Sequence, residues 1–172
     1  MNPEFAAGLR DYLLTGLEGE VAATERVILA VPADQPDYAP DPKATKALAL
    51  AYHIISSEIA FFEFIATQSM DRFMAEMPES IKTPADVIAY RDASRPAAVA
   101  AVRAMSGDDL SKVINFFGAF NFPAVVYLSF ANSHGIHHRG QLSTYLRPMG
   151  SKVPSIYGGS ADEPFEAAAA AS

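Results

Sequence analysis

The chain has 172 residues, a length that suits one domain. Half of the residues are hydrophobic and 19% are charged, so the chain can bury a sizeable core, which excludes a disordered or linker protein. The net charge of −7 has the wrong sign for a protein that binds phosphates, and the lack of cysteine excludes disulfides and thiolate metal sites. We therefore expect no nucleic-acid partner, and any metal must be held by nitrogen or oxygen.

The apolar runs of the sequence are interrupted by Glu, Lys or His well before they reach the length of a membrane span. The first residues, from Met1 to Glu4, lack the basic and then apolar order of a signal peptide. We therefore expect a cytoplasmic protein with no membrane partner.

The first predicted element is a long amphipathic helix over residues 3–31, in which apolar residues recur at spacings of three and four. Asn2 is its expected N-cap, and Pro3 occupies its first position. Four prolines in residues 32–43 then predict a stiff, extended connection. A second helix is predicted over residues 44–68, because the helical periodicity of its apolar residues persists along the whole segment.

A third helix is predicted to begin at Pro84, with Thr83 as its cap. Pro96 is expected to kink this helix or to split it in two, because proline removes a helical hydrogen bond and its ring clashes with the preceding turn. Residues 106–109, a polar segment that contains glycine, are expected to end it.

The next segment, residues 110–122, is apolar but interrupted by Gly118, and it indicates an ordered crossing or a short hairpin. A fourth helix is predicted from about Pro123 to Arg147, followed by a loop-like tail.

Four long amphipathic helices in a small domain imply an all-α fold, a four-helix bundle. We assign this single domain to residues 1–160 and expect a flexible C-terminal tail over residues 161–172.

Three of the four histidines lie in the predicted fourth helix, and two of them form a pair at positions i and i+4. His134 and His138 are on one face, about 6 Å apart along the axis, so both rings can bind one ion at about 2.1 Å. A third ligand must come from another helix, and His53 in the second helix is the remaining histidine. His137 is displaced by about 100° around the helix from His138 and cannot join the pair.

Three neutral nitrogen ligands would leave a divalent ion its full charge and at least one open position, which is typical of a catalytic site. Such ligands suit zinc, nickel, cobalt, copper or iron(II) better than magnesium or calcium. A pair of histidines at this spacing also occurs by chance, so the residues alone leave open the alternative of surface or hydrogen-bonded core histidines.

The stretch from His134 to Arg147, HGIHHRGQLSTYLR, resembles the fourth-helix signature of the DinB/YfiT-like family. The segment MGSKVPSIYG after it, and Tyr52-His53 followed by Ser57-Glu58, are also similar to that family. The resemblance covers most of residues 5–160. It implies an up-down-down-up four-helix bundle that holds one divalent ion on three histidines, which correspond to His53, His134 and His138. Some relatives resemble metal-dependent transferases of low-molecular-weight thiols.

Several other residues of these helices could support the site. Gln141 and Tyr145 each lie seven residues after one of the paired histidines and return to nearly the same azimuth, so they are either pocket groups or bundle packing. Arg139 is expected to face away from the ion, in an ion pair or an interface. Gly140 is expected to let a neighbouring helix approach closely. Glu58 could orient a ligand from a neighbouring element.

The phenylalanines form two sequence clusters, Phe61, Phe62 and Phe64, and then Phe116, Phe117, Phe120 and Phe122. Such clusters are more often core or dimer interface than a substrate pocket, and we expect a homodimer.

The leading hypothesis is a metal-dependent enzyme, with zinc or nickel as the expected ion. The ion would activate a thiol or water for attack on a small electrophile. Because the chain has no cysteine, a thiol would have to be a cosubstrate. One alternative is a non-catalytic module that binds a metal or a small molecule, and another is a metal-free helical scaffold.

Overall fold

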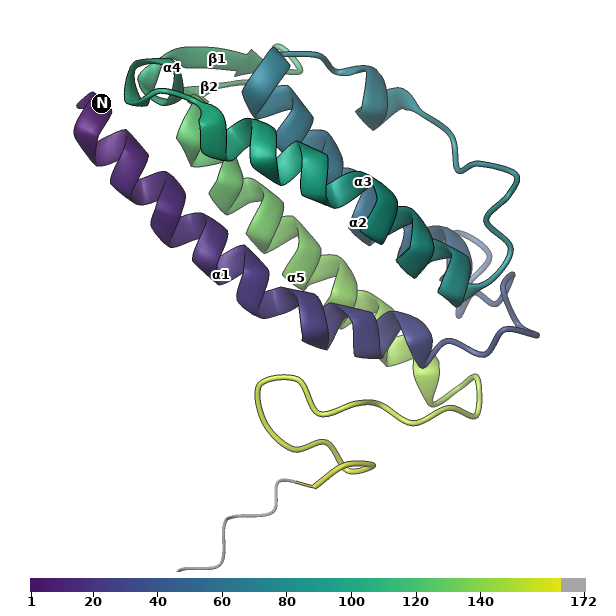
Figure 1. The fold of residues 1–172 in the computed structure, drawn as a ribbon. Coiled ribbons are helices and arrows are strands. Elements are labelled where there is room, and N and C mark those ends of the chain that lie inside the picture. The colour runs from purple at the N-terminus through teal and green to yellow at the C-terminus, as the bar shows by residue number, and fades with distance from the viewer. Residues whose placement is uncertain (165–172) are drawn as a thin grey trace, which may run out of the picture.

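The computed structural model describes residues 1–164, which form a four-helix bundle with a small hairpin at one end (Figure 1). The long helices are α1 (Pro3–Leu29), α2 (Ala47–Thr67), α3 (Pro84–Ala104) and α5 (Tyr127–Leu146). The chain runs one way in α1 and α5 and the opposite way in α2 and α3, which is the up-down-down-up order (Figure 1). The predicted fold class is confirmed.

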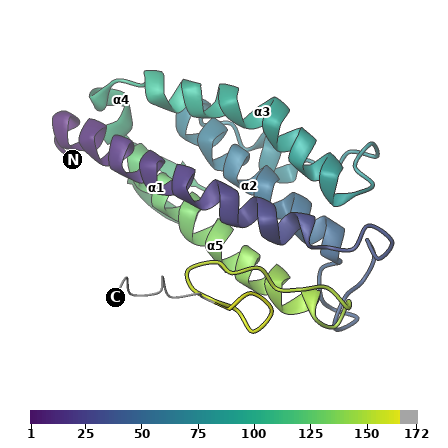
Figure 2. The ribbon, with the colours of Figure 1, turned by 60° about the horizontal axis from the view of Figure 1, so that its bottom comes forward.

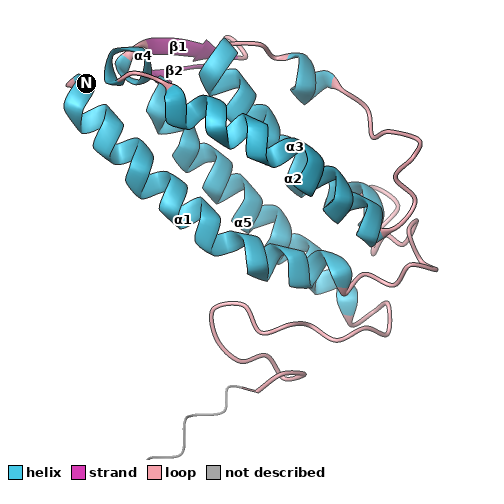
Figure 3. Ribbon diagram, viewed as in Figure 1, coloured by secondary structure: helices cyan, strands magenta, loops and turns pink. Residues whose placement is uncertain are grey.

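The shorter elements lie in the connections between the helices (Figure 3). They are η1 (Asp71–Met74), α4 (Gly107–Ser111), β1 (Val113–Phe116), β2 (Phe120–Pro123) and η2 (Ala124–Val126).

The four helices stand at the corners of a square, because α1 and α2 each pack against both α3 and α5. The helices α3 and α5 are therefore diagonally opposite each other across the core. The most buried helix is α2, with apolar residues around most of its circumference. Within the described residues, α2 is the one helix whose length and composition could span a membrane, and 72% of that window is buried inside the bundle, as in the core helix of a soluble protein.

Hydrogen-bonded caps define where α1 and α3 begin. The side chain of Asn2 accepts a hydrogen bond from the backbone N–H of Glu4 at 2.8 Å, as predicted, and Pro3 follows at the first helical position. Thr83 and Asp86 form a capping box, in which each side chain bonds the backbone N–H of the other residue. The predicted starts of both helices are therefore confirmed.

The third helix is not split at Pro96. It continues through this residue as one element, and Pro96 lies on its exposed face, where water can satisfy the carbonyl that loses its partner. The helix ends at Ala104, just before residues 106–109, as expected. That segment begins α4, where the Ser106 side chain accepts from the backbone N–H of Asp109.

The crossing between α4 and α5 is an antiparallel hairpin, one of the two predicted alternatives. Val113 pairs with Pro123 and Phe116 with Phe120 in its register. The turn needs two residues with positive φ, which are Phe117 at 52° and Gly118 at 71°.

The chain after α5 runs back beside the bundle (Figure 2). Asp162 pairs with Arg147 at 2.9 Å, and Glu163 pairs with Arg26 of α1. Of the tail predicted to be flexible, residues 161–172, the part from 165 onward lies outside the described residues.

Candidate metal centre

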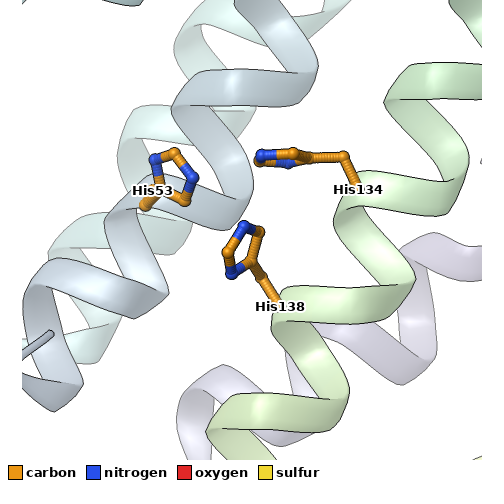
Figure 4. A group of neighbouring side chains, drawn as sticks. All are labelled: His53, His134 and His138. Atoms are coloured by element: carbon orange, nitrogen blue, oxygen red, sulfur yellow. The ribbon is translucent and has the colours of Figure 1, made fainter. Parts of the chain in front are cut away.

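The structure brings together the three histidines that the sequence singled out. His53 projects from α2, and His134 and His138 project from α5, so that all three rings point into one space between the helices (Figure 4). The ring centroids are 5.0 Å apart for His53 and His134, 4.7 Å for His53 and His138, and 4.4 Å for the pair on α5. One nitrogen of each ring lies within 4.8 Å of a nitrogen of the other two.

These separations are close to what a single ion requires. Two nitrogens bound tetrahedrally at about 2.1 Å from one ion are about 3.4 Å apart. The nitrogens of this group, within 4.8 Å of one another, could reach that geometry through small rotations of the side chains. The group therefore fits a transition-metal ion that prefers imidazole nitrogen.

The ring of His134 is held from the neighbouring helix by Ser57. The Ser57 hydroxyl lies 3.1 Å from Nδ1 of His134 and also donates to the carbonyl oxygen of Ile54 at 3.3 Å. When the hydroxyl proton bonds to Ile54, the oxygen accepts from Nδ1–H of His134, and Nε2 of that tautomer keeps a free lone pair for a metal ion.

The ring of His138 is held in the same way from its own helix. Oε1 of Gln141 lies 2.9 Å from Nδ1 of His138, and Nε2 of Gln141 donates to the hydroxyl of Tyr145 at 3.3 Å. The amide oxygen can only accept, so Nδ1 of His138 carries the proton and Nε2 is free. Of the two interpretations left open for Gln141 and Tyr145, the structure favours support of the site for Gln141, with Tyr145 orienting its amide.

Desolvation lowers the pKa of two of the three imidazoles, those of His53 and His134. Burial, followed by the nearby His138, His53 and His137, lowers the pKa of His134 to about 4. Burial and the charge of His138 also lower the pKa of His53 below its usual value. At neutral pH both rings therefore keep the lone pairs that a metal ion needs.

A pocket of about 360 Å³ opens beside the three histidines, and His53 and His138 form part of its wall. Tyr52, Arg72 and Phe73 also line it, the last two from the segment around η1 that crosses the length of the bundle. The guanidinium of Arg72 is fixed by two bonds of 2.6 Å to Glu63. The volume of this pocket suits a small molecule. Sequence analysis did not identify Arg72 as a pocket residue, because its position depends on the path of the loop between α2 and α3.

Burial and the neighbouring Tyr90 raise the pKa of Tyr52 to about 12. The Tyr52 hydroxyl therefore stays protonated at neutral pH.

Several other residues considered in the sequence do not belong to the three-histidine group, although the ring centroid of His137 lies 4.9 Å from that of His138. Arg139 faces away from them, as expected, and pairs with Glu20 at 2.6 Å with 2% of its side chain exposed. His137 is exposed and stands outside the metal-compatible group. The expectation for Glu58 is wrong, because its carboxylate pairs with Arg95 of α3 at 2.8 Å instead of orienting a histidine.

The expectation for Gly140 is also wrong. The position is exposed, and a methyl group built there would meet no atom within 4 Å, so no helix of the bundle approaches it closely.

The first aromatic cluster, Phe61, Phe62 and Phe64, is buried in the core, whereas the second cluster is largely exposed. Phe116 of the hairpin stacks on Phe61 of α2, with ring centroids 5.4 Å apart. The ring of Phe61 packs edge-on against that of His134, with centroids 5.9 Å apart. The hairpin therefore packs against α2 next to the three histidines. Phe117 and Phe120 remain 57% and 45% exposed.

Comparisons with a family model and with solved structures agree with this architecture. The sequence model of the DinB family matches residues 11–167. A DinB-like protein from Bacillus subtilis superposes with a TM-score of 0.65 at 21% identity, over 86% of this chain and 96% of that one. A DinB-like protein from Bacillus cereus superposes with a TM-score of 0.68 at 19% identity, over 84% of this chain and 95% of that one. At these identities the two crystal structures support the fold alone. Among curated protein sequences no match is found.

Proposed function

The chain belongs to the DinB family, and we propose that it is a metal-dependent enzyme whose divalent ion is held by His53, His134 and His138. The observation that carries the proposal is the convergence of three imidazole rings, two of which are held at Nδ1 by hydrogen bonds with Ser57 and Gln141. A family that is associated with metal binding adds support to this assignment.

Three neutral ligands leave coordination positions open, which distinguishes catalytic sites from closed structural ones. A divalent ion in this site would supply Lewis-acid chemistry, lowering the pKa of a thiol or water so that it can attack an electrophile. We propose zinc or nickel, because three nitrogen donors suit both ions.

The chain's own residues would bind and orient the reactants. The pocket beside His53 and His138 has room for a small molecule. Tyr52 and Arg72 line it and offer hydrogen-bond donors to polar groups of that molecule. Since the chain has no cysteine, any thiol nucleophile enters as a low-molecular-weight cosubstrate. The reaction we propose is transfer or hydrolysis at a small electrophile.

The experiment is a screen of metal-loaded protein against low-molecular-weight thiols paired with small electrophiles, and against hydrolysable esters. We expect saturable turnover that a chelator abolishes and that zinc or nickel restores. The variant His138→Ala should lose the turnover while its circular dichroism spectrum stays helical. Metal binding without turnover on any substrate pair would favour the non-catalytic binding module instead.

The expected cytoplasmic location and homodimeric state remain proposals. Light scattering on purified protein would test the second, with twice the mass of one chain expected.

A further inference from the structure

We propose that one water molecule is bound in the centre of the bundle, bridging Arg91 of α3 and Asn132 of α5. Both residues line a cavity of about 20 Å³ that lies among α1, α2, α3 and α5, separate from the pocket of the three histidines. The inference does not depend on whether the histidines bind a metal.

Two buried polar atoms at this cavity have no hydrogen-bond partner among the described residues, Nη1 of Arg91 and Oδ1 of Asn132. The other side of the Arg91 guanidinium is fully engaged, since Nη2 donates to Glu25 at 2.8 Å and Nε donates to Asp92 at 2.9 Å. A buried polar group without a partner is rare in folded proteins, and the usual solution is an ordered water.

The remaining polar residues around the cavity are already paired. Glu58 accepts from Arg95, while Glu20 and Thr24 both accept from Arg139. The rest of the wall is mostly aliphatic, including Leu17, Val21, Ile54 and Ile136. Among the residues that line the cavity, Arg91 and Asn132 are therefore the two with a buried side-chain atom that has no partner among the described residues.

The size of the cavity and the nature of the two atoms select the ligand. A volume of about 20 Å³ exceeds the 10–15 Å³ that one water requires, and it is too small for a larger molecule. The Arg91 nitrogen is a donor and the Asn132 oxygen is an acceptor, so the ligand must accept one hydrogen bond and donate another. Water does both, whereas an anion cannot donate to Asn132 and would also meet the carboxylates of Glu20 and Glu58.

The water would join two helices that lie diagonally across the bundle. Because α3 and α5 are diagonal in the bundle, a bridge through the centre fixes their separation across the core. Asn132 precedes His134 by two residues on α5, so the same bridge holds the helix that carries two of the three histidines.

A crystal structure of the full chain at a resolution that shows ordered waters is the direct test. We expect one water peak within hydrogen-bond distance of both Nη1 of Arg91 and Oδ1 of Asn132. A dry cavity, or a protein group bonded to either atom in place of water, would overturn the proposal.

A second measurement works in solution, where magnetic relaxation dispersion of water nuclei counts the long-lived internal waters. Asn132→Leu removes the acceptor at nearly constant volume, so we expect one fewer long-lived water and a fall in Tm of roughly 3–8 °C. Ile136→Val is the matched control, because it changes the cavity wall and keeps both polar atoms, and it should retain the water. An unchanged water count in Asn132→Leu would contradict the proposal.

Discussion

The hydroxyl of Ser57 on α2 lies 3.1 Å from Nδ1 of His134 on α5. This contact joins the two helices that supply all three histidines, and it holds the ring of His134 at Nδ1. The same hydroxyl lies 3.3 Å from the carbonyl oxygen of Ile54, and when its proton bonds there the histidine nitrogen is the donor in the contact.

If Ser57 fixes the ring of His134, its loss should weaken metal binding without abolishing it. We expect Ser57→Ala to reduce the affinity for zinc by about 10–100-fold, the usual effect of removing a group that orients a metal ligand. Isothermal titration with a competing chelator measures the change. Ser143→Ala is the matched control, because the Ser143 hydroxyl on α5 donates to the backbone carbonyl of Gly140, away from the three histidines. Equal affinities in both variants would show that the contact with His134 is irrelevant to binding.

The pKa of His134 makes the stability of the metal-free chain depend on pH. In the unfolded chain this histidine binds a proton below its ordinary pKa of 6.5, whereas the folded chain binds it only near pH 4. The unfolded state therefore gains a proton first, and the free energy of unfolding should fall as the pH drops from about 6.5 to 4. Above pH 6.5 the group should contribute no pH dependence.

Urea unfolding of chelator-treated protein at several values of pH in this window measures the effect. His134→Gln should show a smaller loss of stability on acidification than the parent, since acidic groups elsewhere contribute equally to both proteins. Parallel curves for the two proteins would refute the assigned cause.

Arg95 neutralises Glu58 in the interior between α2 and α3. The guanidinium lies 2.8 Å from Glu58 and 2.9 Å from Glu18, and the side chains of Arg95 and Glu58 are 12% and 16% exposed. Burial already raises the pKa of Glu58, so the loss of its partner leaves a poorly solvated carboxylate. We expect Arg95→Met to lower the free energy of unfolding by about 3 kcal/mol.

The double variant Glu58→Leu with Arg95→Met should recover most of that loss, because neither charge of this pair then remains in the interior. Chemical denaturation of the single and double variants completes the cycle. A double variant as unstable as Arg95→Met alone would mean that packing, and not charge, accounts for the effect.

Arg139 connects α5 to α1 and to the chain that follows the bundle. It pairs with Glu20, donates to Thr24 at 3.2 Å, and donates to the hydroxyl of Tyr157 at 2.5 Å. We expect Arg139→Met to cost about 3 kcal/mol of stability, since it leaves Glu20 without its main partner. Arg147→Met removes an exposed pair with Asp162 and should cost less than about 1 kcal/mol. Similar losses in thermal denaturation would contradict the distinction between the two arginines.

The part of the site that the sequence predicts is the part set by helical periodicity. His134 and His138 share a face whatever the tertiary structure, and a long, apolar second helix with one central histidine leaves His53 as the partner. The first residues of α1 and α3 were likewise predictable, because the side chains of Asn2 and Thr83 accept hydrogen bonds from backbone N–H groups only a few residues away.

The part that could not be predicted depends on distant packing. Ser57 reaches His134 across 77 positions of the chain, and Glu58 finds Arg95 across 37. Nothing in the sequence pattern predicts either of these two contacts, because both depend on how α2 is rotated against α3 and α5. Helix α3 continued through Pro96 for a related reason: the effect of a proline depends on whether the bundle exposes that face to water.

The central claim is that His53, His134 and His138 together hold one metal ion, and metal content tests it most directly. Elemental analysis should be performed on untagged protein that was never exposed to a nickel column. The variants His53→Ala, His134→Ala and His138→Ala should be measured in parallel. The exposed His137, which stands outside the group, provides the matched control His137→Ala. We predict near one equivalent of zinc or nickel in the parent and in His137→Ala, and little in the other three variants. A parent that holds no metal and takes up none from added zinc or nickel would contradict the account.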